Sequence, residues 1–252
     1  MELPLVKTED LHKSFQSLEV LRGVSVTVDR GESIVVIGQS GCGKSVLLKH
    51  VIRLLQPDSG RVLFDGQDLS RLNTRDITAV RRRVGMLFQS AALFDSLTVA
   101  ENVGLGLTES RLYSNDQVAE IVREKLKMVA LTDAADKNPA ELSGGMRKRV
   151  GLARAIADDP EMLLYDEPTT GLDPVTADMI NGLIVDLNQQ LNVTSIAVTH
   201  DMKSAYRIAS RIIVLYRGRV EFDGSPEEIR DSDNEVVRQF ISGSSIGPIQ
   251  VR

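Results

Sequence analysis

One glycine-rich segment constrains this chain more than any other part of its sequence. It reads Gly38-Gln39-Ser40-Gly41-Cys42-Gly43-Lys44-Ser45. An apolar run with the composition of a strand, Ser33–Ile37, precedes it, and a helical pattern, Val46–Leu55, follows it. This is the spacing G-x-x-x-x-G-K-[ST] in a strand–loop–helix context, which predicts a loop that cradles phosphate groups.

Each residue type in this cradle has a physical reason to be there. Glycines let backbone N–H groups curl around a phosphate, and the N-terminus of the following helix adds positive potential. Lys44 can reach the outer phosphate oxygens, and the Ser45 hydroxyl can ligate Mg²⁺. We therefore expect the segment from Gly38 to Val46 to bind a nucleotide together with Mg²⁺.

Composition limits the class of protein further. The 252 residues are long enough for a hydrophobic core, and the single cysteine, Cys42, excludes an internal disulfide framework and a multi-cysteine zinc site. A formal charge of −5 argues against nucleic acid as the main partner. No apolar stretch approaches the roughly 18 residues that span a bilayer, and residues 1–4 lack the layout of a secretion signal. We expect a cytosolic chain that meets a membrane only through a partner.

Short strand patterns alternate with longer helical patterns, which is typical of an α/β fold with a mostly parallel central sheet. The clearest strand candidates are Ser33–Ile37, Val84–Phe88, Met162–Tyr165, Ser195–Val198 and Arg211–Tyr216. Several are continuous apolar runs, which predict a sheet covered by helices on both faces. The first 30 residues and the segment Arg61–Asp65 alternate between apolar and polar side chains, and they predict an antiparallel β flank.

Between Ala91 and Pro139 the strand patterns stop. Ser114 and Gln117 form a capping box ahead of a helical stripe that ends near Val129. We expect a helical subdomain over residues 91–158, inserted in a domain that spans residues 1–242. Residues 243–252 contain Gly, Ser and Pro with little periodicity, and they predict an extended or disordered C-terminal arm.

Two acidic residues, Asp166 and Glu167, end the apolar run Met162–Tyr165. The tips of strands are where an α/β sheet presents groups to its ligand. Downstream of a phosphate cradle, Asp166 is suited to hold Mg²⁺, and Glu167 is suited to orient and deprotonate a water. The alternative is a pair of acids that simply faces solvent at a strand end.

A third motif, Leu142-Ser143-Gly144-Gly145-Met146, lies between the cradle and the acids and precedes a helical run, Arg147–Ala157. With Gln89 before it and Gly171-Leu172-Asp173 and His200 after the acids, the chain resembles the nucleotide-binding subunits of ABC transporters over nearly its whole length. The resemblance implies a P-loop NTPase fold of the ABC type and an ATPase that uses ATP and Mg²⁺ to drive transport. Met146 departs from the more usual Gln, which removes a side-chain amide but keeps the backbone N–H groups.

The resemblance also implies a homodimer. In the family two copies face head to tail, and Ser143, Gly144 and Gly145 of each copy close over the ATP of the other. Asp173 then couples the two sites across the dimer, and as the residue before Pro174 it also predicts a helix cap.

Three further residues take roles from the resemblance. Gln89 would touch Mg²⁺ and the attacking water, with a solvated loop amide as the alternative. His200 would hydrogen-bond the γ-phosphate, although a lone histidine is often only structural. Phe15 would stack on adenine, or it packs in the core of the β flank. Alkylation of Cys42 is expected to block ATP binding.

The basic run Arg147–Arg149 lies on the helix behind the glycine motif, where we expect its charges to face solvent or the partner's phosphates. A second run, Arg81–Arg83, ends a helix predicted over Thr74–Arg82, where cations favour the helix dipole. Neither run therefore requires a nucleic-acid partner.

Local sequence around the motifs indicates the cargo. Phe88–Val103, Thr169–Thr176, and the later Val237–Phe240 with Gly247 and Pro248 resemble Mla-type phospholipid transport ATPases. This implies an integral membrane permease, an MCE lipid-shuttle protein and a small cytoplasmic regulatory subunit as partners, and a position on the inner face of the plasma membrane. An amino-acid or osmolyte importer is the alternative, and a non-transport ABC ATPase is a remote one. The apolar segment Ala91–Leu97 is expected to form the groove that receives a cytoplasmic helix of the permease.

Overall fold

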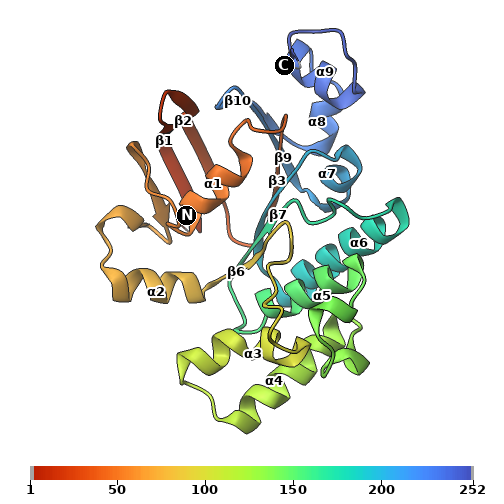
Figure 1. Ribbon diagram of the computed structural model, residues 1–252. Coiled ribbons are helices and arrows are strands. Elements are labelled where there is room, and N and C mark those ends of the chain that lie inside the picture. The colour runs from red at the N-terminus through yellow and green to blue at the C-terminus, as the bar shows by residue number, and fades with distance from the viewer. Residues whose placement is uncertain (1–2, 251–252) are drawn as a thin grey trace. The chain divides into compact units, whose positions relative to one another are not determined.

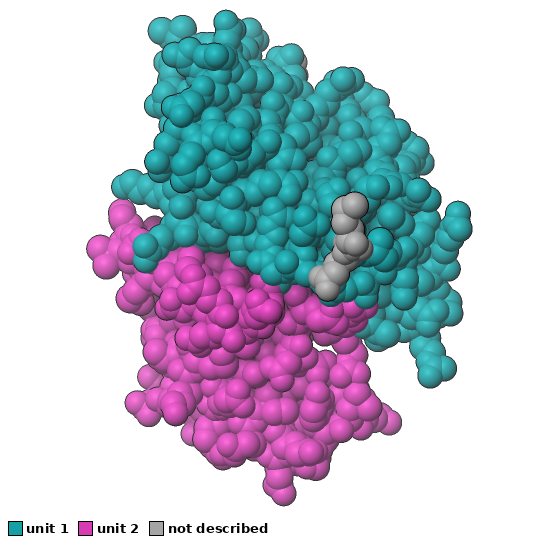
Figure 2. All heavy atoms as spheres, turned by 180° about the vertical axis from the view of Figure 1, so that it is seen from behind, with its two compact units in different colours: residues 1–80, 194–252 teal, residues 81–193 magenta. Residues whose placement is uncertain are grey.

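The computed structural model describes residues 3–250, and the chain divides into two compact units (Figure 2). Unit 1 comprises residues 1–80 and 194–252, and unit 2 comprises residues 81–193. Residues 1, 2, 251 and 252, at the ends of the expected domain and arm, lie outside the described residues. The unit boundaries fall within helix α2 (Thr74–Arg82), which has its predicted bounds, and immediately before strand β8 (Thr194–Thr199).

Unit 1 contains the predicted antiparallel flank. Its strands are β1 (Val6–Phe15), β2 (Leu18–Val28), β4 (Ser59–Phe64) and the short β5 (Gln67–Asp68), in the order β2-β1-β4-β5 (Figure 1). Val6 pairs with Val28 on one side and with Phe64 on the other, and all three side chains are buried. The alternation in the sequence is therefore that of strands with one buried face.

The parallel strands of unit 1 are centred on β3 (Ser33–Ile37), which pairs in parallel with β8 and with β9 (Arg211–Tyr216). Strand β10 (Arg219–Gly224) pairs antiparallel with β9. Helix α7 (Met202–Ile208) packs against β3 and β8, and α1 (Lys44–Val51) packs against β8. The continuous apolar run of β3 is thus explained, because Ile34–Ile37 are fully buried.

Helices α8 (Pro226–Arg230) and α9 (Glu235–Ser242) follow in unit 1 and lead into the arm. The Gln239 amide nitrogen donates to the carbonyl oxygens of Ser244 (3.2 Å) and Ile249 (3.0 Å), and its oxygen accepts from Ile249 N (2.6 Å). The Tyr216 hydroxyl donates to the carbonyl oxygen of Pro248 at 3.0 Å. Residues 243–250 are therefore an arm folded back on their own chain.

Unit 2 combines a parallel strand pair with a group of helices. Its elements are β6 (Val84–Leu87), α3 (Val99–Ser110), α4 (Asn115–Met128), α5 (Gly144–Ala155), β7 (Met162–Asp166) and α6 (Pro174–Leu191). Helix α3 packs against α4 and α5, and α5 also packs against β6 and α6. The capping box of Ser114 and Gln117 begins α4 as predicted, and a second box, of Thr98 and Glu101, begins α3.

Two helices start earlier than the sequence pattern predicted. Helix α1 begins at Lys44 rather than Val46, because Gly43 in the left-handed region is its N-cap, and it ends at Val51 rather than Leu55. Helix α5 begins at Gly144 rather than Arg147, because the Ser143 hydroxyl accepts from Met146 N at 3.2 Å and caps the first turn. Both glycine motifs therefore extend into the first turn of a helix.

Candidate nucleotide-binding and hydrolysis site

The phosphate cradle begins where β3 ends. Gly38 adopts φ 154°, and a Cβ built on it would lie 2.2 Å from the carbonyl oxygen of Leu215. Gly43 adopts φ 108° and has no side chain with which to cap α1. Glycine is required at both positions, and a helix that starts in this way presents its first-turn N–H groups to an anion.

Lys44 carries a positive charge into the cradle. Its Nζ donates to the carbonyl oxygens of Gly38 at 2.8 Å and Gln39 at 3.3 Å, and the residue is only 6% exposed. Ser45 is the next residue in the same helical turn. An ammonium group and a hydroxyl at a glycine-rich helix start are the donor set that a Mg²⁺-bound polyphosphate requires, so these residues fit the predicted ligand.

His200 lies at the same edge of the sheet as the cradle. Strands β3 and β8 are parallel neighbours, and Ile37 pairs with Thr199. Gly38 and His200 directly follow these paired residues, so the two strands bring the exposed histidine next to the start of the loop. The structure thus brings together two predicted site residues that are far apart in the sequence.

A hollow of about 630 Å³ lies along the cradle, within unit 1. Gln39, Ser40, Gly41 and Cys42 line it together with residues that the sequence reasoning missed: Leu18, Glu19, Val20, Arg22, Tyr216, Arg217, Gly218 and Gln250. Phe15 is not among the lining residues; the residue is 43% exposed, and Lys13 Nζ lies 5.6 Å from the centroid of its ring. Stacking of Phe15 on adenine therefore stays a prediction.

The two acids of unit 2 end a fully buried strand. Asp166 is 7% exposed and Glu167 is 9% exposed, so the alternative of a solvent-facing pair is wrong. Glu167 adopts φ 49°, which is uncommon for a residue other than glycine, and Thr170 Oγ1 donates to its carboxylate at 3.0 Å. Backbone strain of this kind collects at functional sites. The local sequence does not predict the left-handed backbone of Glu167 or its hydrogen bond from Thr170.

Gln89 lies at the same sheet edge as the acids. Strands β6 and β7 are parallel, and Leu87 pairs with Tyr165. Gln89 and Glu167 are each the second residue beyond this pair, so the strand ends present both. Gln89 is exposed. The oxygen of its side-chain amide, like a carboxylate oxygen, is a suitable ligand for Mg²⁺.

Lys148 of α5 joins these two strand ends, and the sequence reasoning placed it wrongly. The sequence predicts that its charge faces solvent or the partner's phosphates, but the residue is only 5% exposed. Its Nζ donates to the carbonyl oxygens of Gln89 at 2.5 Å and Glu167 at 3.1 Å. Burial lowers the pKa of Lys148 to about 8, against the opposing effect of the Asp166 and Glu167 charges. The neighbouring Arg147 and Arg149 donate to backbone carbonyls of Leu142, Val129 and Ala130.

The Ser143–Gly145 motif lies at the N-terminus of α5. A Cβ on Gly145 would lie 2.6 Å from the Thr176 methyl group, so the glycine lets α5 approach α6 closely. Asp173 caps α6, as predicted, by accepting from the N–H groups of Val175 and Thr176, each at 3.0 Å. The hydrogen bond from the Thr176 hydroxyl lowers the pKa of Asp173.

The predicted site residues are divided between the units. Unit 1 holds the cradle, Phe15 and His200; unit 2 holds Gln89, the Ser143–Gly145 motif, the two acids and Asp173. Within unit 1, parallel strand pairing places Gly38 and His200 at the same sheet edge, and within unit 2 it does the same for Gln89 and Glu167.

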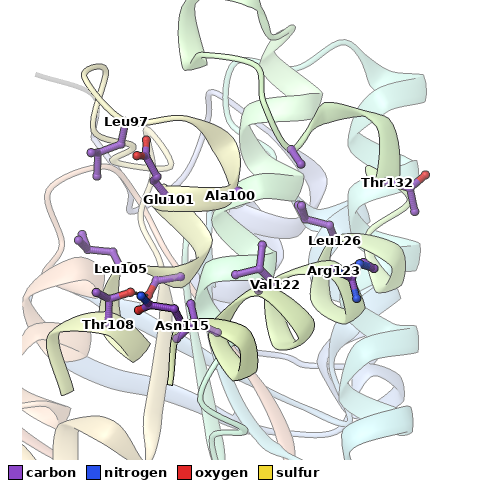
Figure 3. A pocket seen from close by; sticks show the side chains of 14 residues that line it. Leu97, Ala100, Glu101, Leu105, Thr108, Asn115, Val122, Arg123, Leu126 and Thr132 are labelled. Atoms are coloured by element: carbon purple, nitrogen blue, oxygen red, sulfur yellow. Dashed lines mark hydrogen bonds between the residues drawn. The ribbon is translucent and has the colours of Figure 1, made fainter. Parts of the chain in front are cut away.

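Unit 2 also contains an apolar cavity of about 930 Å³ between α3 and α4 (Figure 3). Leu105, Val122 and Leu126 are among the side chains that line it. Of the segment predicted to form a docking groove, only Leu97 lines this cavity, and Ala91 is fully buried. The helices, rather than the segment after Gln89, therefore make most of the cavity wall.

Two further findings concern the described part of the chain. Residues 3–250 contain no helix that is both long and apolar enough to span a bilayer. They also contain no cluster of three or more His, Cys, Asp or Glu side chains that could hold a metal.

Comparison with protein families defines the class of protein. The family model described as ABC transporter matches residues 21–170. Among solved structures, the dimeric ATP-binding cassette MJ0796, bound to ADP and Pi, is 34% identical with a TM-score of 0.81, over 87% of this chain and 98% of that one. The chain therefore belongs to the ABC transporter family and is one of its ATP-hydrolysing cassettes.

Two curated relatives are similar over nearly the whole chain. One is the intermembrane phospholipid transport system ATP-binding protein MlaF of Haemophilus influenzae, 38% identical over 252 residues, which are 100% of this chain and 96% of that protein. The other is the probable ribonucleotide transport ATP-binding protein mkl of Mycobacterium tuberculosis, 40% identical over 97% of this chain and 68% of that protein.

Proposed function

We propose that this chain powers a phospholipid transporter in a bacterial envelope. The observation that carries the proposal is the end-to-end match with MlaF, which covers 96% of that protein, whereas the match with mkl covers 68% of a longer one. The similarity of the segments around Gln89 and Asp173 to Mla-type ATPases, noted from the sequence, agrees with it.

The cargo is tested by purifying the chain with its native partners from membranes. We expect an integral permease, an MCE-type protein and bound phospholipid, identified by mass spectrometry. A periplasmic solute-binding protein as the partner would favour the amino-acid or osmolyte importer. A ribonucleotide as the bound molecule would favour the cargo in the name of mkl. Either result contradicts the phospholipid proposal.

ATP binding is assigned to the cradle, with Lys44 on the outer phosphates. Ser45, Asp166 and Gln89 would hold Mg²⁺, since hydroxyl, carboxylate and amide oxygens suit this cation. Mg²⁺ bound to phosphates needs few protein ligands, and it would supply charge neutralisation of the phosphate oxygens. The buried carboxylate of Asp166 and the hydroxyl of Ser45 in the first turn of α1 support this assignment.

For hydrolysis, Glu167 is the residue that would orient a water and accept its proton. The bond from Thr170 and the buried strand β7 hold its carboxylate in place. His200, beside Gly38 at the sheet edge, would donate a hydrogen bond to the terminal phosphate, and Gln89 would hold the water from the other strand end. Of these groups, Glu167 has its carboxylate held by the hydrogen bond from Thr170, and a carboxylate held in place can stabilise charge without reorganising.

We infer that two copies form a head-to-tail dimer. Ser143, Gly144 and Gly145 at the start of α5 provide helix N-terminal N–H groups suited to a γ-phosphate. Each copy would close this motif over the ATP on the other copy's cradle, and Asp173 would couple the two sites. The dimeric description of MJ0796 supports this arrangement.

The permease would dock on unit 2. The apolar cavity between α3 and α4 is large enough for side chains of a short cytoplasmic helix, and Asn102 rigidifies the loop beside it through bonds to Phe94, Leu97 and Thr98. Phe94 is 53% exposed and available for such a contact. The chain would thereby lie on the cytoplasmic face of the inner membrane, together with an MCE lipid-shuttle protein and a small regulatory subunit of the same system.

A further inference from the structure

We propose that Lys148 is a positioning residue for ATP hydrolysis, whose ammonium group holds the Gln89 strand end and the Glu167 strand end at a fixed separation. The inference rests on the roles proposed above for Gln89 and Glu167. Lys148, both strand ends and helix α5 all lie within unit 2.

The geometry of this tie is specific. Strands β6 and β7 are in register up to the pair of Leu87 and Tyr165, and β7 continues for one more residue, Asp166. Gln89 and Glu167 lie beyond the last residues that pair between the two strands. Lys148 Nζ donates to the backbone carbonyl oxygens of both, at 2.5 Å and 3.1 Å. A single ammonium group thus replaces the strand pairing that would otherwise hold these residues together.

The burial of Lys148 makes this role more than incidental. A buried ammonium group is costly unless it is paired and hydrogen-bonded. A methionine side chain of similar length could fill the same space at less cost, but it has no N–H group to donate to either carbonyl. The carboxylates of Asp166 and Glu167 lie near enough for their charges to favour the ammonium form. The cation therefore also reduces the mutual repulsion of these two adjacent acids.

Lys125 provides a matched control. It is another buried lysine of unit 2, 3% exposed, on α4. Its Nζ lies 2.6 Å from Asp159 and 3.4 Å from Glu124, and neither acid is a predicted site residue. Replacing Lys125 removes a buried cation from the same unit without touching either strand end.

The experiment compares Lys148→Met with Lys125→Met in the purified full chain. We measure kcat for ATP hydrolysis, and the Kd of a fluorescent ATP analogue. We expect Lys148→Met to lower kcat by about 10- to 100-fold, as misplacement of reacting groups does, with the Kd unchanged within about twofold. Lys125→Met should lower the melting temperature but keep kcat within about twofold. Wild-type kcat in Lys148→Met, or equal losses of kcat in both variants, would overturn the proposal.

A second measurement separates positioning from general damage. If Lys148 acts through Gln89, then Lys148→Met should lower kcat far less in a Gln89→Ala background than in the wild-type chain. The reason is that the effects of substitutions at coupled residues do not add. Full additivity contradicts the inference. Should Lys148→Met not fold, Lys148→Leu replaces it under the same criteria, since a leucine side chain cannot donate to either carbonyl.

The Glu167→Gln variant distinguishes failure of this inference from failure of the proposed site. If Glu167→Gln retains turnover, the proposed roles themselves are wrong, and Lys148 has no site to position. If Glu167→Gln loses turnover while Lys148→Met retains it, only the positioning role is refuted.

Discussion

At the scale of single residues, the strained and buried Glu167 is the residue on which the proposed hydrolysis mechanism depends most. Its backbone is in the left-handed region, its carboxylate accepts from Thr170, and its own carbonyl accepts from Lys148. Three constraints from different parts of unit 2 therefore define the position of one carboxylate. A group held in this way can act without reorganising.

Glu167→Gln should bind ATP normally and hydrolyse it about 10²- to 10³-fold more slowly. The amide of the substituted residue has the size of the carboxylate and can still accept the hydrogen bond from the Thr170 hydroxyl, but it cannot accept a proton from water. Phosphate release and binding of a fluorescent ATP analogue measure the two effects. Glu141→Gln, at an exposed acid of the same unit, is the control and should keep wild-type turnover. Turnover near the wild-type rate in Glu167→Gln would contradict the assigned role.

His50 is a buried residue with a predictable pH effect. It is 1% exposed, its Nδ1 bonds the carbonyl oxygen of Val46 at 2.7 Å, and burial lowers its pKa below the ordinary 6.5. The nearby Lys13 charge lowers the pKa further, while Asp58 opposes this. The unfolded chain therefore takes up a proton at a higher pH than the folded chain does.

The stability contributed by neutral His50 should be complete above pH 6.5 and decline as the pH falls below it. Urea unfolding at pH 7.5 and pH 5.5 should show a larger loss of free energy of unfolding for the wild-type chain than for His50→Gln. His12→Gln removes a half-exposed histidine and should keep the wild-type loss. Equal losses in the wild-type chain and His50→Gln would exclude this explanation.

At the scale of elements, the C-terminal arm is tied to α9 by one side chain. Gln239 makes three hydrogen bonds to Ser244 and Ile249, and a Cβ on Gly247 would lie 2.4 Å from its amide oxygen. Gln250 of the arm lines the hollow along the cradle. The arm thus contributes to the surface around the glycine-rich cradle of its own chain.

Gln239→Ala should release the arm and leave the rest of unit 1 folded. We expect the backbone amide of Ile249 to exchange its hydrogen at least about tenfold faster, because it loses the hydrogen bond to Gln239 that protects it from exchange. Hydrogen–deuterium exchange with mass spectrometry measures this. Gln190→Ala removes an exposed amide from α6 and should leave the arm unchanged. An unaltered exchange rate at Ile249 would show that Gln239 does not hold the arm.

At the scale of the whole molecule, one copy carries a full set of motifs, so the proposed homodimer would have two complete sites. With Mg²⁺ and ATP, Glu167→Gln should elute as a dimer in light-scattering chromatography, because slow hydrolysis preserves the bound nucleotide. The double variant Lys44→Ala, Glu167→Gln lacks the cradle's cation and should stay monomeric. Monomeric Glu167→Gln under these conditions, even with its permease, would refute the dimer.

The sequence determined the features that short segments encode by themselves. The phosphate cradle, the antiparallel flank, the capping box at Ser114 and the cap at Asp173 follow from neighbouring residues, because steric and hydrogen-bonding preferences act over a few positions. The order of the motifs along the chain then identified the family. These features need no knowledge of distant contacts.

Tertiary structure decided what depends on residues far apart in the chain. The burial of Lys148, the bond from Thr170 to Glu167, and the closure of the arm by Gln239 were not predicted. Strand pairing alone brings His200 beside Gly38. The composition of a basic run predicts that it is exposed. Whether one of its charges is buried instead depends on the hydrogen-bond acceptors and carboxylates that other elements bring to it, and these cannot be seen in the local sequence.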